Sequence, residues 1–178
     1  MTPQANELLN SWIRDTDSGL EFGSGRSTVW FARRCGKLTS VEHNPDWYQA
    51  VTKRLNEQQL INVDYHLFPR IDDADSRSSQ YVKVAERFGS GELDFVLVDG
   101  IYRDACVAAV LDKIRRDGIL IIDNVHLYFP SDSRSPNAIK VGEPPASDLW
   151  RQALDQLGNW RRIWTSNHVS DTAIFIRN

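Results

Sequence analysis

Cysteine is scarce in this chain, and the two thiols present lie far apart. Among the 178 residues only Cys35 and Cys106 are cysteines. Their separation gives none of the short spacings that zinc sites use. We therefore expect two reduced thiols, as in a cytoplasmic protein, in preference to a disulfide.

The chain also lacks an excess of basic residues. It has 21 Lys and Arg against 24 Asp and Glu, a formal net charge of −3. Domains that bind nucleic acid usually carry a basic surplus, so we expect no nucleic-acid partner, although a local basic patch is left open. No apolar run approaches the ~20 residues that span a bilayer, and no signal-peptide pattern opens the sequence. A membrane partner is therefore not expected.

Short apolar segments alternate with amphipathic ones, and this alternation is typical of an α/β protein. We expect one domain over residues 1–178, built on a Rossmann-like, doubly wound, mostly parallel sheet with helices on both faces and a C-terminal antiparallel hairpin. A short helix is expected within residues 1–17, and a long irregular loop over 126–147 on the substrate side. The expected strands are 20–22, 38–42, 63–68, 93–99, 119–123, 161–165 and 172–177, and the other expected helices are 27–34, one beginning at Asn44-Pro45, 81–88, 103–116 and 148–157.

The segment after the first expected strand, Leu20 to Ser27, is the most informative. Ligands of open α/β sheets bind at the carboxyl ends of the strands. Gly23 and Gly25 allow a tight turn and close approach of the backbone to a ligand, while Ser24 and Ser27 add hydroxyls near a helix N-terminus. Thr28 stands where a dinucleotide-binding fingerprint has its third glycine.

Two acidic residues narrow the choice of ligand. Glu42 ends the second strand about 20 positions after the glycines, where a carboxylate can accept hydrogen bonds from both ribose hydroxyls. NAD and S-adenosylmethionine both fit this pattern. Glu21 favours S-adenosylmethionine, because a buried carboxylate needs a partner and only S-adenosylmethionine has an α-amino group. The six tryptophans are many for this length, and we expect some to line the site.

The strings LEFGSGRST, SVEHN, LDFVLVDG and GILIIDNV resemble the successive strand-end motifs of class I S-adenosylmethionine-dependent methyltransferases, over roughly residues 18–125. The expected terminal hairpin also matches that family. The resemblance implies that Glu21, Gly23, Gly25 and Ser27 hold the methionine end, that Glu42 holds the ribose, and that His43 lies near the ribose or adenine. It also implies adenine contacts around Phe68 to Ile71.

A second cluster concerns the methyl acceptor. Asp99 ends the fourth strand and Asp123-Asn124 end the fifth, so their oxygens should meet and could bind Mg²⁺ or another divalent cation. This is similar to catechol O-methyltransferase and its relatives, in which a metal lowers the pKa of the acceptor hydroxyl. Two departures weaken that similarity: Tyr102 stands where those enzymes have a lysine base, and their N-terminal helices are nearly missing. Asp99 could instead contact the cofactor, with Asp123-Asn124 closing the strand end.

The sequence therefore predicts a methyltransferase for a small molecule, with oxygen as the favoured acceptor atom. Asp99 and His126 are its candidate catalytic residues, His126 as a general base. An NAD-dependent oxidoreductase and a non-catalytic nucleoside-binding domain are the alternatives. The short N-terminus suggests an open site or one covered by a second subunit of a homo-oligomer.

Overall fold

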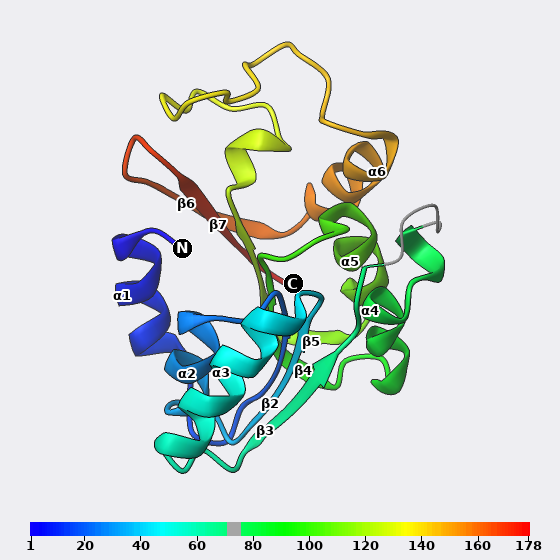
Figure 1. The fold of residues 1–178 in the computed structure, drawn as a ribbon. Helices are drawn as coiled ribbons and strands as arrows, with labels where there is room; N and C mark the ends of the chain where they lie inside the picture. The colour runs from blue at the N-terminus through cyan, green and yellow to red at the C-terminus, as the bar shows by residue number, and fades with distance from the viewer. Residues whose placement is uncertain (71–75) are drawn as a thin grey trace.

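The computed structural model describes residues 1–70 and 76–178 (Figure 1). Its strands form one sheet in the order β3-β2-β1-β4-β5-β7-β6. Strands β1 to β5 are parallel, and β7 runs antiparallel to both β5 and β6, which confirms the predicted fold class. The bounds are β1 (Ser18–Phe22), β2 (Lys37–Glu42), β3 (Val63–Leu67), β4 (Leu93–Val98), β5 (Ile114–Asp123), β6 (Arg161–Ser166) and β7 (Asp171–Ile176).

Helices cover both faces of the sheet (Figure 1). On one face, Phe31 stacks on Phe95 with ring centroids 4.8 Å apart. On the other, Trp150 packs edge-on against Phe129, with centroids at 5.1 Å, within the larger of two apolar cores. The first face carries α1 (Pro3–Trp12), α2 (Arg26–Ala32) and α3 (Pro45–Glu57), and the second carries α4 (Gln80–Lys83), α5 (Arg103–Val110) and α6 (Asp148–Leu157).

Polar side chains fix where the helices begin. Asn44 caps α3 by accepting from the Trp47 N–H, with Pro45 in the first turn as predicted. Ser147 caps α6 in the same way, accepting from the Trp150 N–H. The loop over 126–147 is irregular as expected, apart from the 3₁₀ turn Val125–Leu127 and one bridge between Ser131 and Lys140.

The predicted helix over 103–116 is wrong in its second half. Helix α5 ends at Val110, and β5 begins at Ile114, which pairs with Leu93. The pairing register then shifts before Phe95 meets Ile119. Asp117, at φ +60°, belongs to this irregular stretch of β5 and does not end a helix.

Three further boundaries differ from the sequence expectation. Ser18 and Gly19 belong to β1, where Gly19 leaves room for the Phe95 ring, which a Cβ would meet at 2.1 Å. The predicted helix 81–88 consists of α4 and the 3₁₀ segment Val84–Arg87. Between the predicted strand 63–68 and helix 81–88, Ser76–Ser78 forms a 3₁₀ turn, whereas Ile71, the last of the residues implied to contact adenine, lies outside the described residues.

Both cysteines are buried and unpaired, as predicted. Burial raises the pKa of the Cys35 thiol to about 12. In the described ranges, no helix has the length and apolar character needed to cross a membrane.

Candidate functional site

The loop after β1 packs directly against the loop after β4. Gly23 has φ +92°, and a Cβ there would lie 2.5 Å from the Gly100 backbone. The Gly23 N–H also donates to the Val41 carbonyl at 2.9 Å. Gly23 is therefore required for contact between two strand ends of the protein itself, while the sequence argument had assigned it to close approach of a ligand.

Beside this loop lies a cavity of about 490 Å³, between the carboxyl edge of the sheet and the helices of the first face. Four predicted cofactor residues line it: Ser24, Gly25, Ser27 and Asp99. The structure thus brings together the ends of β1 and β4, as the strand-end argument required. The remaining lining residues, which the sequence argument did not single out for the site, are Met1, Asn6, Arg26, Trp30 and Trp47.

Two of the six tryptophans are walls of this cavity. The Trp47 indole N–H donates to the Ser24 carbonyl at 2.7 Å, and its ring lies 3.7 Å from the position a Gly25 Cβ would take. Trp30 lies on α2, with the Arg34 guanidinium 4.0 Å from its ring centroid. The number of tryptophans predicted that some of them line the site, but it did not show which of the six do so.

Glu21 is completely buried beneath the glycine loop. Its Oε2 accepts from the hydroxyls of Thr28 and Ser40, each at 2.6 Å. Thr28 in turn accepts from the Gly25 N–H at 2.8 Å, which explains a threonine at the third-glycine position. Glu21 therefore stabilises the turn into α2 through its hydrogen bond with Thr28, and it does not itself line the cavity.

Burial also changes the acidity of Glu21. Desolvation raises its pKa from 4.5 to about 7, although hydrogen bonding by Ser27, Ser40 and Thr28 opposes the shift. Within the described residues its Oε1 has no hydrogen-bond partner. Ser27 lies between this carboxyl group and the cavity, because it both interacts with Glu21 and lines the cavity.

The carboxylate of Glu42 is almost fully buried and turns toward the glycine loop. Its Oε2 accepts from the Ser24 N–H at 3.1 Å and the Ser24 hydroxyl at 2.8 Å. Its Oε1 accepts from the N–H groups of His43 and Asn44, at 2.8 and 2.9 Å. These four hydrogen bonds fill the acceptor positions of a carboxylate, so Glu42 fixes the loop in this state.

Two side chains flank Glu42. The hydroxyl of Tyr65 on β3 lies 2.5 Å from the Ser24 hydroxyl, and burial raises the pKa of Tyr65. The His43 ring has its Nδ1 3.0 Å from Glu42 Oε1 and lies edge-on to Tyr81, with ring centroids 6.3 Å apart. His43 is thus next to the predicted ribose residue, and Tyr65 is a neighbour that sequence reasoning missed.

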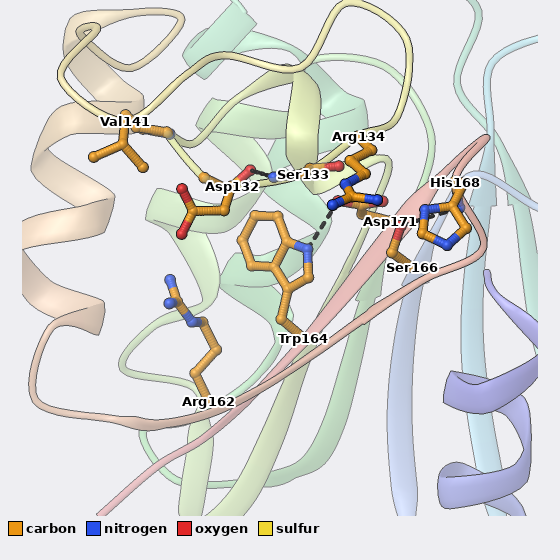
Figure 2. Close-up of a pocket in the computed structure, with 11 residues that line it drawn as sticks. Asp132, Ser133, Arg134, Val141, Arg162, Trp164, Ser166, His168 and Asp171 are labelled. Carbon is orange, nitrogen blue, oxygen red and sulfur yellow. Dashed lines mark hydrogen bonds between the residues drawn. The ribbon is translucent and has the colours of Figure 1, made fainter.

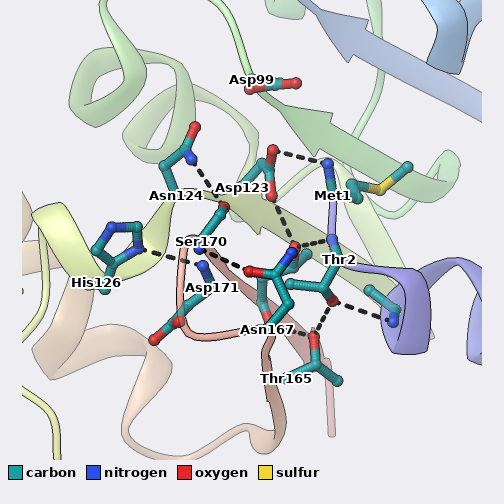
Figure 3. Close-up of polar contacts among 12 residues, drawn as sticks. Met1, Thr2, Asp99, Asp123, Asn124, His126, Thr165, Asn167, Ser170 and Asp171 are labelled. Carbon is teal, nitrogen blue, oxygen red and sulfur yellow. Dashed lines mark hydrogen bonds and ion pairs between the residues drawn. The ribbon is translucent and has the colours of Figure 1, made fainter. Parts of the chain in front are cut away.

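The predicted metal ligands do not form a ligand set. Asp123 Oδ2 lies 2.8 Å from the terminal amino group of Met1, and its Oδ1 accepts from the Thr172 hydroxyl at 2.7 Å (Figure 3). Asn124 donates through Nδ2 to the Ser170 hydroxyl at 2.9 Å. Figure 3 draws no contact between Asp99 and this group. Across the described ranges, no cluster of three or more His, Cys, Asp or Glu side chains could hold a metal ion.

Asp99 remains at the cavity although it takes no part in a metal cluster. Its Oδ1 accepts from Arg103 Nη2 at 2.9 Å. Burial and the nearby charge of Asp123 raise the pKa of Asp99, and Arg103 counteracts part of the shift. Asp99 is therefore a half-buried carboxylate that binds a proton more readily than an ordinary aspartate.

His126 is placed away from the cavity beside β1 and β4. Its side chain is buried, and its Nδ1 accepts from the Asp171 N–H at 3.2 Å. Its carbonyl accepts from the Ile139 N–H. These contacts tie the loop 126–147 to β7, an arrangement that favours a structural role over that of a base at the cofactor cavity.

A second cavity of about 470 Å³ lies between the loop 126–147 and the hairpin of β6 and β7 (Figure 2). Its wall includes Trp164, whose indole N–H donates to Asp171 Oδ2 at 2.8 Å. Burial opposes ionisation of Asp171, but hydrogen bonds from Ser133, Ser135, Ser166 and Trp164 prevail and lower its pKa. Arg134, Arg162 and His168 bring cationic or polar side chains to the same cavity.

A third cavity of about 420 Å³ adjoins the loop after β4. Tyr128 and Trp150 stack there with ring centroids 4.7 Å apart, and Arg103 lies 5.7 Å from the Tyr128 ring centroid. The loop 126–147 therefore borders two cavities, one at the strand end of β4 and one at the outer hairpin.

Comparison with known proteins gives the family. A family of methyltransferase domains matches residues 20–125, more than half of the chain, and no curated protein matches its sequence. A candidate caffeoyl-CoA O-methyltransferase from Staphylococcus aureus is similar in structure, with a TM-score of 0.66 and 17% identity over 100% of this chain and 85% of that one.

Two further solved structures share the fold. An rRNA methylase from Streptococcus thermophilus has a TM-score of 0.64 and 10% identity over 98% of this chain and 94% of that one. A candidate methyltransferase from Streptococcus mutans, solved in complex with SAH, has a TM-score of 0.63 and 8% identity over 98% and 96%. With the glycine-loop cavity at the ends of β1 and β4, these matches show that the chain belongs to the methyltransferase-domain family and has the fold of class I S-adenosylmethionine-dependent enzymes.

Proposed function

We propose that this chain transfers a methyl group from S-adenosylmethionine to an oxygen of a small molecule. The observation that carries the proposal is the cavity of about 490 Å³. It places the glycine loop, two tryptophans and a half-buried carboxylate around one space at the carboxyl edge of the sheet. That edge is where α/β sheets of this kind bind nucleoside ligands.

Several side chains in and next to the cavity would have a role toward such a cofactor. Arg26 and Ser27 offer donors for the methionine carboxylate, and Glu21 can balance the methionine ammonium through Ser27 or a water. The ribose hydroxyls would take over the two positions on Glu42 Oε2 that the hydroxyl and the N–H of Ser24 now occupy. Trp30 and Trp47 provide apolar walls that exclude water.

For the acceptor, the protein has to orient the molecule and to supply a group that takes one proton from it. The sulfonium of S-adenosylmethionine supplies an activated methyl group, so the protein has mainly to align the acceptor with it. Asp99 lies at the cavity with a raised pKa, which suits it to take the proton of an acceptor hydroxyl. This role for Asp99 supports oxygen as the acceptor atom.

The net charge of −3 supports a small acceptor over RNA, although rRNA methylases share the fold. When the protein is incubated with S-adenosylmethionine that carries a labelled methyl group, hydroxylated small molecules from a panel should therefore become labelled. Product from total RNA alone would overturn the small-molecule part of the proposal.

Isothermal titration calorimetry tests the cofactor. S-adenosylhomocysteine and S-adenosylmethionine should bind with one site per chain at micromolar affinity, and NAD should not bind. Binding of NAD in their place would favour the oxidoreductase alternative. Absence of binding by both S-adenosyl compounds at high micromolar concentration would remove the proposal.

We propose that the loop 126–147 shapes the acceptor site, at the cavity that adjoins the β4 end. Tyr128→Ala should then raise the acceptor KM at least tenfold with little change in affinity for S-adenosylhomocysteine, because one stacked wall of that cavity is lost. Arg134→Ala, on the same loop but at the outer cavity, is the matched control and should leave KM nearly unchanged. The reverse pattern would place the acceptor at the outer cavity.

A further inference from the structure

The guanidinium of Arg103 lies among the three residues that the sequence pattern assigned to a divalent cation, and it contacts two of their side-chain oxygens together with backbone carbonyls of the same loops. Its Nη2 donates to the Asp99 carbonyl and Oδ1, at 2.6 and 2.9 Å. Its Nη1 donates to the Asp123 carbonyl at 2.6 Å and contacts Asn124 Oδ1 at 3.4 Å. Its Nε donates to the Gly100 carbonyl at 2.8 Å.

These contacts use all the donors that the side chain has. An arginine presents five N–H groups and stays charged at any ordinary pH. Five contacts to the ends of β4 and β5 account for every one of them, and the side chain is only 15% exposed. Arg103 is therefore committed to the protein and is neither a solvated residue at a helix start nor a free group for an anionic substrate.

The side chains of Asp123 and Asn124 are also engaged. Both carboxylate oxygens of Asp123 have partners, and Thr172 is one of them. Asn124 Nδ2 donates to the Ser170 hydroxyl (Figure 3). This contact orients the amide so that its Oδ1 faces Arg103 Nη1. A metal ion at this position would have to displace a permanently charged side chain and break its hydrogen bonds to two strand ends.

We propose that Arg103 is the resident cation of this strand-end cluster, and that the chain works without a divalent metal bound there. Arg103 is a positioning residue: it joins the loops after β4 and β5 and sets the direction of Asp99 toward the cavity. The acceptor part of the inference rests on the proposed function. Without a metal, an acceptor cannot be held as a bidentate chelate of two neighbouring hydroxyls, so a single hydroxyl or another lone nucleophile is the expected acceptor class.

The metal part can be measured on the wild-type chain without any acceptor. Titration with Mn²⁺, followed by electron paramagnetic resonance, should show no site tighter than about millimolar. EDTA and Mg²⁺ should leave both the unfolding temperature and the affinity for S-adenosylhomocysteine unchanged. One micromolar Mn²⁺ site that Asp99→Asn removes would overturn the inference, whether or not the S-adenosyl compounds bind.

The positioning part is tested by chemical rescue. Arg103→Ala should lower the unfolding temperature by several degrees and weaken S-adenosylhomocysteine binding at least tenfold. Millimolar ethylguanidinium should restore much of that affinity, whereas ethylammonium should not. Arg103→Lys keeps the positive charge but lacks the planar guanidinium group, so its affinity for S-adenosylhomocysteine should remain below that of the wild type. If Arg103→Ala does not fold, Arg103→Lys is compared with the wild type instead. Wild-type affinity for S-adenosylhomocysteine in Arg103→Lys would overturn the positioning role of the guanidinium group.

Discussion

Replacing Glu42 with alanine should weaken S-adenosylhomocysteine binding at least 100-fold. Two effects add in the same direction. The variant loses the carboxylate that would accept the ribose hydroxyls, and it loses the two hydrogen bonds from the His43 and Asn44 N–H groups that hold the start of α3 in place. Hydrogen bonds to a charged group contribute about 1.5–3 kcal/mol each, so losing a ribose pair alone predicts an effect of this size.

Calorimetry measures this affinity, and the unfolding temperature without ligand shows how much of the loss comes from the loop. Glu42→Gln keeps the size of the side chain and one acceptor oxygen, so it should lie between the wild type and the alanine variant. Glu86→Gln, at an exposed position, is the control for the loss of one negative charge from the chain. Unchanged affinity in a folded Glu42→Ala would refute the ribose role of this residue.

Much of the fold could be predicted from local sequence patterns. Short apolar strands between amphipathic helices lead to a parallel sheet, and the strand ends then meet at one edge. Ser24, Gly25, Ser27 and Asp99 were placed together in this way, and they do line one cavity. The sequence around Asn44 and Pro45 also gave the start of α3, because capping is a local interaction.

The failures concern features that depend on contacts distant in sequence. Ile114 lies within the predicted helix 103–116, but its pairing with Leu93 makes it the first residue of β5. Asp117-Gly118 is a turn signal that fits a helix end and a strand irregularity equally well. In this case tertiary pairing overrides local periodicity.

The directions of the side chains at the site could not be predicted from the sequence either. Spacing put Glu42 at a strand end but could not show that its oxygens are already occupied by Ser24 and two backbone groups. The same limit hid the position of Arg103, whose partners at the end of β5 lie 20 and 21 residues further along the chain. Residue types and strand ends thus locate a site, whereas the hydrogen bonds within it decide which groups remain available to a ligand.

Glu21 should make the stability of the chain fall as the pH rises from about 4.5 to above 7. Its pKa is 4.5 ordinarily and about 7 in the folded state, mainly because burial disfavours the charged form. The unfolded chain therefore releases this proton at lower pH than the folded chain does. The contribution of protonated Glu21 to the free energy of unfolding is complete below pH 4.5 and is lost as the pH rises through 7. Between these limits the free energy of unfolding falls by about 3 kcal/mol.

Glu21→Gln removes this titration while keeping the size of the side chain and an acceptor for Thr28 and Ser40. Urea unfolding of both proteins between pH 4 and 8.5 isolates the effect, because other groups contribute equally to both curves. The wild type should lose about 3 kcal/mol relative to the variant across this range, and parallel curves would contradict the buried titration. Added S-adenosylmethionine should reduce this pH-dependent loss of stability in the wild type relative to Glu21→Gln. Its ammonium group favours the ionised carboxylate, which the glutamine variant cannot form.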